Sequence, residues 1–95
     1  MLEKEIERQM KKAVSERGGL FYKFISPGND GVPDRLVIAP TGEIWFVELK
    51  TSTGRLSKIQ KHRIAELEKR KANVRVVFGL SDALNFVNEV MPNGV

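Results

Sequence analysis

Apolar residues recur along this chain with two periods, one typical of helices and the other of strands. The helical period is clearest near the N-terminus, where apolar residues recur every three or four positions. Those positions are Leu2, Ile6, Met10, Ala13 and Val14. They predict an amphipathic helix over residues 2–17, which Gly18 and Gly19 bring to an end.

Short stretches rich in apolar and β-branched residues predict strands over residues 20–25, 34–39, 44–50 and 74–78. The segment 26–33 is too rich in Pro and Gly for a helix or a strand, and residues 40–43 predict a hairpin turn. Residues 44–47 read Ile-Trp-Phe-Val. Such a continuous apolar run predicts a central position in the sheet for the third strand.

Two serines predict the starts of two further helices. Ser57 is the predicted N-cap of a helix that runs to about Lys71, and Ser81 is the predicted N-cap of the last helix. Pro92 and Gly94 would close that last helix, whose apolar face consists of Ala83, Phe86, Val87 and Val90. The resulting order, αβββαβα, predicts an α/β fold in which helices flank a mixed β-sheet.

Length and composition narrow the class of protein. The chain has 95 residues, of which 41% are hydrophobic and 29% charged, so we expect one globular domain over residues 1–95. There are no cysteines, which excludes disulfides, thiolate metal sites and a Cys nucleophile. No apolar run approaches the ~18 residues needed to cross a bilayer, and no secretory signal is visible. We therefore expect a cytoplasmic protein without a membrane partner.

The net charge of +4 is unevenly distributed. The segment from Lys50 to Lys71 holds eight basic and two acidic residues, or +6, which leaves −2 for the rest of the chain. A basic segment on such a body is typical of a protein that contacts nucleic acid. A solvated helix face would explain the same charges equally well.

Two carboxylates and an ammonium are predicted to converge at one edge of the sheet. Asp34 opens the second strand, while Glu48 and Lys50 lie on one face of the third, about 7 Å apart along it. If these strands form an antiparallel hairpin, Asp34 meets Glu48 and Lys50. The simpler alternative is that Glu48 and Lys50 form an edge ion pair and that Asp34 is a turn residue.

Converging carboxylates repel each other unless a cation lies between them, and oxygen ligands favour Mg²⁺ or Mn²⁺ over zinc. Such an ion beside a lysine is suited to phosphodiester hydrolysis, because the ion activates water and the lysine offsets developing charge. Gln60 lies on the apolar stripe of its predicted helix, with Leu56, Ile64 and Leu67. A polar site at the sheet edge would give its amide partners, although it could instead reach solvent.

The first helix offers one more carboxylate. Glu7 lies on the flank of the buried face, from which it could turn toward the metal cluster or pair with Lys11. Glu3 and Glu16 are expected to be surface charges. The only histidine, His62, faces away from the apolar stripe and lacks the partners of a zinc site or a nucleophilic triad. No phosphate-binding or dinucleotide-binding glycine motif is present, so no organic cofactor is expected.

In combination, these motifs resemble one nuclease family. They are Gly31-Val32-Pro33-Asp34-Arg35, Val47-Glu48-Leu49-Lys50-Thr51, and Gly54-Arg55-Leu56-Ser57 followed by Gln60, with Glu7 on the preceding helix. The chain resembles the virus-type replication-repair nuclease (VRR-NUC) family of the PD-(D/E)XK superfamily from about residue 7 to residue 78. Two positions depart from the family pattern. Arg63 replaces a frequent aromatic residue, and a Gly expected near residues 71–73 is missing.

The resemblance implies a restriction-endonuclease-like fold and a metal-dependent DNA endonuclease. Asp34, Glu48 and the backbone carbonyl of Leu49 would bind Mg²⁺ or Mn²⁺, and Lys50 would position or activate the attacking water. Gln60 and Glu7 would complete the site, with Glu7 as a possible further metal ligand. Basic residues nearby are expected to contact DNA, namely Arg35, Arg55, Lys58, Lys61 and Arg63.

Cutting both strands of DNA requires two sites, whereas a chain of this size has room for one. A two-fold homodimer would supply the second site. Stand-alone members of the family resemble Holliday-junction resolvases in this respect, which favours branched DNA such as four-way junctions as substrate. Two other functions remain open from the sequence: a non-catalytic DNA-binding module, and a nuclease that acts on ordinary duplex DNA.

Overall fold

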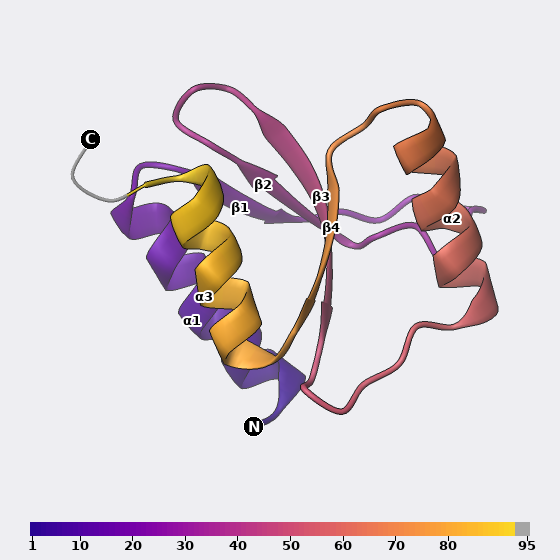
Figure 1. The fold of residues 1–95 in the computed structure, drawn as a ribbon, viewed down its shortest axis with the longest axis horizontal. Helices are drawn as coiled ribbons and strands as arrows, with labels where there is room; N and C mark the ends of the chain where they lie inside the picture. Colours follow the sequence, from indigo (N-terminus) through magenta and orange to yellow (C-terminus); the bar gives the residue numbers. More distant parts are fainter. Residues whose placement is uncertain (93–95) are drawn as a thin grey trace.

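The computed structural model describes residues 1–92 (Figure 1). Its elements follow the predicted order αβββαβα. They are α1 (Glu3–Glu16), β1 (Leu20–Lys23), β2 (Arg35–Ile38), β3 (Ile44–Lys50), α2 (Lys58–Lys69), β4 (Val74–Phe78) and α3 (Gly79–Val90).

The four strands form one mixed sheet in the order β1-β2-β3-β4. The pairs β1–β2 and β2–β3 are antiparallel, whereas β3 and β4 run parallel, with α2 in the connection between them. As predicted, β3 is central, because it pairs on both sides. Helices α1 and α3 cover one face of the sheet, and α2 lies on the other (Figure 1).

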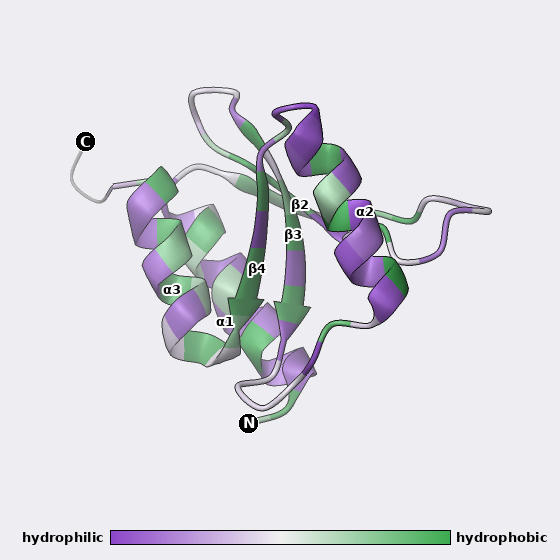
Figure 2. Ribbon diagram, turned by 45° about the vertical axis from the view of Figure 1, so that its right-hand side comes forward, coloured by the Kyte–Doolittle hydropathy of each residue, from purple (hydrophilic) through white to green (hydrophobic). Residues whose placement is uncertain are grey.

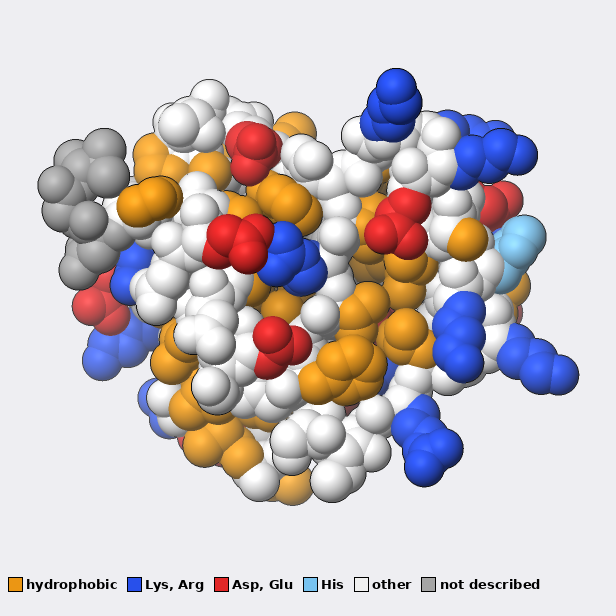
Figure 3. Space-filling view, viewed as in Figure 1, with side chains coloured by type: hydrophobic (Ala, Val, Ile, Leu, Met, Phe, Trp, Pro, Cys, Tyr) orange, Lys and Arg blue, Asp and Glu red, His pale blue; other side chains and the backbone are white. Residues whose placement is uncertain are grey.

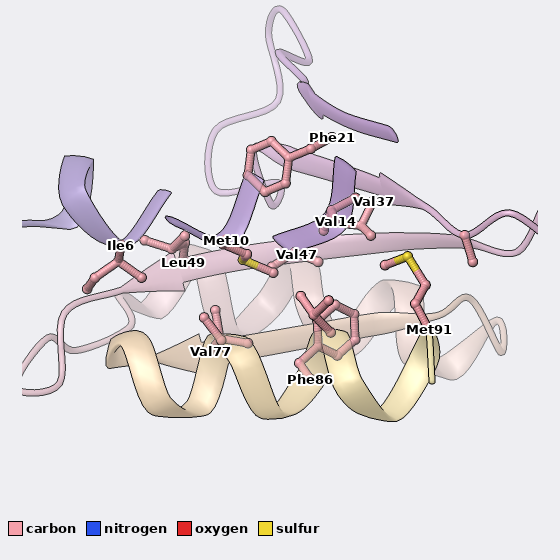
Figure 4. Close-up of a cluster of buried hydrophobic side chains, with 13 residues drawn as sticks. Ile6, Met10, Val14, Phe21, Val37, Val47, Leu49, Val77, Phe86 and Met91 are labelled. Carbon is pink, nitrogen blue, oxygen red and sulfur yellow. The ribbon is translucent and has the colours of Figure 1, made fainter. Parts of the chain in front are cut away.

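The hydrophobic core lies between the sheet and the α1–α3 layer (Figure 4). Side chains alternate along β3, so Val47 and Leu49 enter this core and both are fully buried. Large apolar side chains of α1 and α3 meet them, including Ile6, Met10 and Phe86. Each side chain buried in this way contributes about 1.5–3 kcal/mol. The same alternation turns Glu48 and Lys50 toward the opposite face, the one that α2 covers.

Helix α2 covers its face of the sheet more thinly. Figure 2 shows that it is largely hydrophilic, and Ile64 is its only buried residue. The predicted apolar stripe is therefore present only in part, because Leu56, Gln60 and Leu67 are half-buried. Polar side chains near the sheet edge thus keep access to solvent on this side of the molecule.

The predicted start of α2 is confirmed. The Ser57 hydroxyl accepts a hydrogen bond from the Gln60 N–H at 3.2 Å, and the Gln60 Oε1 accepts one from the Ser57 N–H at 2.8 Å. This reciprocal pair is a capping box. It fixes the Gln60 side chain at the first turn of the helix.

The predicted start of α3 was wrong. The helix begins at Gly79, and Phe78 occupies the N-cap position that was assigned to Ser81. The reason is that Asp82 supplies the capping acceptor: its Oδ2 accepts the Phe78 N–H at 2.8 Å. Ser81 lies inside the first turn. Pro92 follows the end of the helix at Val90, as expected, and Gly94 lies outside the described residues.

The bounds of two strands also differ from the predicted ones. The first strand stops at Lys23 rather than at residue 25, and β2 begins at Arg35, which leaves Asp34 just before the strand. The Phe24 N–H still donates to the Asp34 carbonyl at 2.8 Å, so Asp34 is held against β1. None of the helices within residues 1–92 has the length and apolar character needed to span a bilayer.

Candidate active site

The pairing of β2 with β3 places the two central carboxylates opposite each other. Arg35 is the register partner of Val47, and one further step along both strands sets Asp34 against Glu48. Both even-numbered residues lie on the α2 side of the sheet, as does Lys50. The hairpin therefore brings together the residues that the sequence singled out.

Glu48 is an unusual residue for the middle of a sheet, since it is only 5% exposed. Its Oε2 lies 3.8 Å from the Lys50 Nζ and accepts a hydrogen bond of 3.4 Å from the Gln60 Nε2. Burial raises the pKa of this carboxyl to about 7, with a further contribution from the negative charge of Asp34, while Lys50 opposes the change. The site thus contains a carboxylate whose charge the protein compensates only in part.

Asp34 is held by Arg35, whose side chain lies on the α1 face of the sheet. Its carboxylate forms an ion pair with Arg35, whose Nε also donates to the Glu7 Oε2 at 2.6 Å. Arg35 is 7% exposed. Its predicted role as a DNA contact does not fit this placement, because the side chain lies beneath α1 and both ends of its guanidinium are used within the protein.

Glu7 pairs with basic side chains outside its own helix. It pairs with Arg35 and approaches the Lys23 Nζ to 3.9 Å, and it forms no ion pair with Lys11. The sequence could not show this because the pair joins helix α1 to strand β2, and its geometry depends on how the two pack. Glu7 is thus linked to Asp34 through Arg35.

Glu3 was expected to be a surface charge, but it lies beside the candidate site. An open hollow of about 530 Å³ lies beside Asp34 and Arg35, and its remaining lining residues are Glu3, Lys4, Glu7 and Lys23. The charge of Glu3 is also among those that raise the pKa of Glu48. Its position four residues before Glu7, on the same helix face, was the available signal. Glu3 therefore belongs to the surroundings of the site rather than to the general surface.

The backbone at the end of β3 offers one more oxygen donor at this edge of the sheet, the Leu49 carbonyl. The Phe46 N–H donates to the Asn73 carbonyl, on the β4 side. Because backbone groups of successive strand residues point to opposite neighbours, the Leu49 carbonyl points to the β2 side. There it lies beyond the last β2–β3 pair, next to Pro33, which has no N–H to donate.

Three of the predicted DNA contacts are accessible. Arg55, Lys58 and Lys61 are exposed, and within residues 1–92 no carboxylate lies within 4.0 Å of their charged groups. Figure 3 shows Lys and Arg side chains gathered over the α2 side of the molecule. His62, also on α2, is exposed as predicted and lies 3.5 Å from Glu66.

Arg63 differs from these residues. Its Nε donates to the Asp30 carbonyl at 2.9 Å and its other end contacts Glu66 at 3.0 Å. The side chain therefore ties the 24–34 segment to α2. Its predicted role as a DNA contact does not fit that engagement, which depends on a residue 33 positions away in the sequence.

The donor set fits a hard divalent cation. Asp34, Glu48 and the Leu49 carbonyl offer only oxygen, which Mg²⁺ and Mn²⁺ prefer. Within residues 1–92, no three acidic or histidine side chains already converge as a metal-binding group, in keeping with the ion pair between Asp34 and Arg35. A buried Glu48 facing a second negative charge is nevertheless an environment that a cation would stabilise.

Three comparisons relate this chain to known proteins. Residues 3–79 match the family model of the VRR-NUC domain. A solved structure described as a VRR_NUC domain superposes with a TM-score of 0.77 and 32% identity, covering 98% of this chain and 97% of that one. A segment of 48 residues is 54% identical to the "Putative nuclease p44" of Acyrthosiphon pisum secondary endosymbiont phage 1.

That segment is half of this chain and about half, 52%, of the phage protein. The family model and the solved structure, by contrast, extend over nearly all of the elements described above, including the hairpin that carries Asp34 and Glu48. The predicted mixed sheet with flanking helices is confirmed by the same superposition. The chain belongs to the VRR-NUC domain family.

Proposed function

We propose that this domain is a Mg²⁺- or Mn²⁺-dependent endonuclease that hydrolyses phosphodiester bonds in branched DNA. The observation that carries the proposal is the buried Glu48 carboxylate, with Asp34 opposite it across the hairpin and Lys50 beside it. Burying a charged carboxylate is costly unless the charge is compensated. A nuclease site uses that feature, because it must attract a cation and then a phosphate.

Asp34, Glu48 and the Leu49 carbonyl would hold the cation. When bound, the cation supplies charge neutralisation at the phosphate and acidifies water. Lys50, whose side chain is 21% exposed and whose Nζ lies 3.8 Å from Glu48, is placed to orient the attacking water and to offset negative charge that develops on the phosphate.

Two further residues are proposed as positioning residues. Gln60 donates to Glu48 and is itself fixed by the capping box with Ser57, so the start of α2 orients the Glu48 carboxylate. Glu7 holds Arg35, and Arg35 holds Asp34. The proposed role of Glu7 is therefore to orient Asp34 rather than to bind the cation.

The DNA would approach along α2. Arg55, Lys58 and Lys61 are exposed on the segment that leads from β3 into this helix, and each can neutralise a phosphate. This arrangement supports an entry route in which the backbone of the DNA crosses the start of α2 and reaches the end of β3.

Branched DNA is the proposed substrate and a homodimer the proposed active form. The described part of the chain, residues 1–92, contains a single such site, whereas two cuts in opposite strands need two. A two-fold pair of chains would present two equivalent sites at a fixed separation, as resolution of a four-way junction requires.

The test is a cleavage assay with a labelled four-way junction and a linear duplex of matching sequence, each in Mg²⁺, Mn²⁺ or EDTA. We expect metal-dependent cuts in the junction. Lys50→Ala should slow them roughly 10²- to 10⁴-fold, the range for loss of a group that assists proton transfer. Asp34→Ala should abolish them, and Glu68→Ala, at an exposed position of α2, should not affect them.

The outcomes separate the alternatives. Junction binding without metal-dependent cuts would leave a DNA-binding module. Equal cleavage of the linear duplex would indicate an ordinary duplex nuclease. Full activity of Asp34→Ala or Lys50→Ala would remove these residues from the mechanism.

A further inference from the structure

The strands β3 and β4 end side by side, next to the proposed site (Figure 1). A shallow hollow lies at these strand ends. It has a volume of about 420 Å³, and it is lined by Gly54, Arg55, Leu56, Lys61 and Phe78. This volume falls within the range of roughly 300–1,000 Å³ typical of ligand pockets. The hollow is separate from the one that Asp34 and Arg35 line.

Phe78 is the register neighbour of Lys50 in the parallel β3–β4 pair. Adjacent Val77 is fully buried in the core, so Phe78 points to the opposite face, which it shares with Lys50 and Glu48. Neighbouring strands lie about 4.8 Å apart. The phenylalanine ring is therefore next to the lysine that we place beside the scissile phosphate.

The ring is both accessible and anchored. Phe78 is 38% exposed at the C-terminal end of β4, an edge strand of the sheet. Its N–H is bound by Asp82, and the following Gly79 has φ +85° and packs so closely on Ser52 that an added Cβ would lie 3.1 Å from the Ser52 Cβ. The backbone on both sides of the ring is thus fixed.

The rest of the hollow is cationic. Arg55 and Lys61 are exposed, no acidic residue lines the hollow, and within residues 1–92 neither side chain has a carboxylate partner within 4.0 Å. An aromatic face flanked by two cations is complementary to one nucleotide with its phosphates, because the base stacks and the phosphates pair with the charges. A purely apolar peptide would leave both cations unmatched.

We propose that Phe78 stacks on an unpaired base of the bound DNA strand, while Arg55 and Lys61 contact the phosphates on either side of it. Inside a duplex both faces of a base are covered by its neighbours, so only an unpaired base offers a face to the ring. The inference rests on the proposed function and gives it a substrate class: DNA with unpaired bases at or near a branch point.

The experiment measures DNA binding in EDTA, where no cleavage is expected, by the anisotropy of a labelled DNA. One DNA is a duplex with a single-stranded branch of unpaired thymidines, and the other is the same duplex without the branch. Phe78→Ala should weaken binding of the branched DNA by roughly 5- to 150-fold, which corresponds to ~1–3 kcal/mol for one stacked base. Its affinity for the plain duplex should change less than about two-fold, within the error expected for a lost neutral side chain.

Further variants identify the cause of any loss. Phe78→Trp should bind the branched DNA as tightly as the wild type or more tightly, because it keeps the aromatic face. Ile44→Ala, at the opposite end of β3 and 49% exposed, is the control for removal of an exposed apolar side chain and should change neither affinity. Lys61→Glu should weaken binding of both DNAs, since it removes a phosphate contact.

Equal losses for both DNAs in a folded Phe78→Ala, or a Phe78→Trp as weak as Phe78→Ala, would overturn the stacking proposal. So would an absence of preference for the branched DNA in the wild type. Selective loss in Phe78→Ala with no metal-dependent cutting by the wild type would instead uphold stacking and reject the nuclease. The two proposals can therefore fail separately.

Discussion

At the scale of single residues, Glu48 is the least exposed charged residue within residues 1–92, at 5%. It lies among core strands with Gln60 and Lys50 as its polar neighbours, and the negative charge of Asp34 adds to the cost of its ionisation. Its pKa rises to about 7 as a result. Ionisation of Glu48 therefore costs stability, and a bound cation would offset that cost.

This environment predicts a pH dependence of stability without metal. A folded pKa near 7 against an ordinary value of 4.5 means that the native state binds more protons between these values. The Glu48 contribution to the free energy of unfolding is therefore fully present below pH 4.5 and is lost as the pH rises through 7. The loss is on the order of 3 kcal/mol.

The Glu48→Gln variant has no carboxyl group at this position, so this contribution to the pH dependence of stability should be lost. In EDTA, the free energy of unfolding of this variant should exceed that of the wild type above pH 7, and the difference should shrink steadily toward pH 4.5. Denaturant unfolding at several pH values measures it, with Glu68→Gln as an exposed control. A difference between wild type and Glu48→Gln that does not vary with pH would contradict the assignment.

At the scale of elements, two helices end in the same way with different residues. After α1, the Gly19 N–H donates to the Val14 carbonyl and the Gly18 N–H to the Ser15 carbonyl. After α2, the Ala72 N–H donates in the same way to the Leu67 carbonyl, and the Lys71 N–H to the Glu68 carbonyl. Both ends are Schellman motifs, which place one residue in the left-handed region. That residue is Gly18 with φ +81° after α1, but Lys71 with φ +62° after α2. The glycine that the family pattern leads one to expect near residues 71–73 is thus missing at the position where it would relieve strain.

The end of α2 therefore carries a prediction about backbone strain. Lys71→Gly and Lys71→Ala both remove the charge, but only glycine adopts the left-handed conformation without a steric cost. The glycine variant should exceed the alanine variant by about 1 kcal/mol in free energy of unfolding. The control is Ala65→Gly, at an exposed position in the middle of α2, which should lose about 1 kcal/mol. Thermal or denaturant unfolding that ranks Lys71→Ala above Lys71→Gly would refute this reading of the helix end.

At the scale of the whole molecule, the proposed chemistry is confined to one end of the sheet. The α1–α3 layer covers one face of the sheet and α2 the other (Figure 1), and Lys and Arg side chains gather over the α2 side (Figure 3). On that side the Lys50 side chain is 21% exposed. On the proposed function, one chain would offer one cutting position along DNA, and a second chain would supply the other.

The homodimer can be tested by mass and by mixing. Sedimentation at the concentration used for cleavage should give twice the 10.7 kDa mass of the chain. When wild type is mixed with excess Lys50→Ala, mixed dimers should nick one strand of a junction rather than resolve it. Paired cuts by a species of single-chain mass would exclude the dimer.

Much of the site follows from local rules. The short turn between β2 and β3 fixes their register, and the two-residue period of strands sorts Glu48 and Lys50 onto one face, opposite to Val47 and Leu49. The Ser57–Gln60 capping box is likewise a feature of four consecutive residues. These features were predictable because each depends on residues that are close in sequence or joined by a tight turn.

The partners of Glu7, Arg35 and Arg63 were not predictable in this way. Arg35 lies on the odd-numbered face of β2, and only the packing of α1 on that face brings Glu7 to it. Arg63 meets Asp30 because the crossover sets α2 beside the 24–34 segment. A long charged side chain can pair with any carboxylate within its reach, so its sequence position leaves its partner open.

The sequence by itself thus determined the order of the elements, the face of each strand residue and the meeting of Asp34 with Glu48, because periodicity and a short turn are local constraints. The tertiary structure decided which basic residues hold the protein together and which remain available for DNA. It also placed Glu3 near the site and Phe78 beside Lys50. Those placements depend on how helices pack on the two faces of the sheet and on the parallel pairing of β3 with β4, and both are set by burial of the whole core rather than by any one segment.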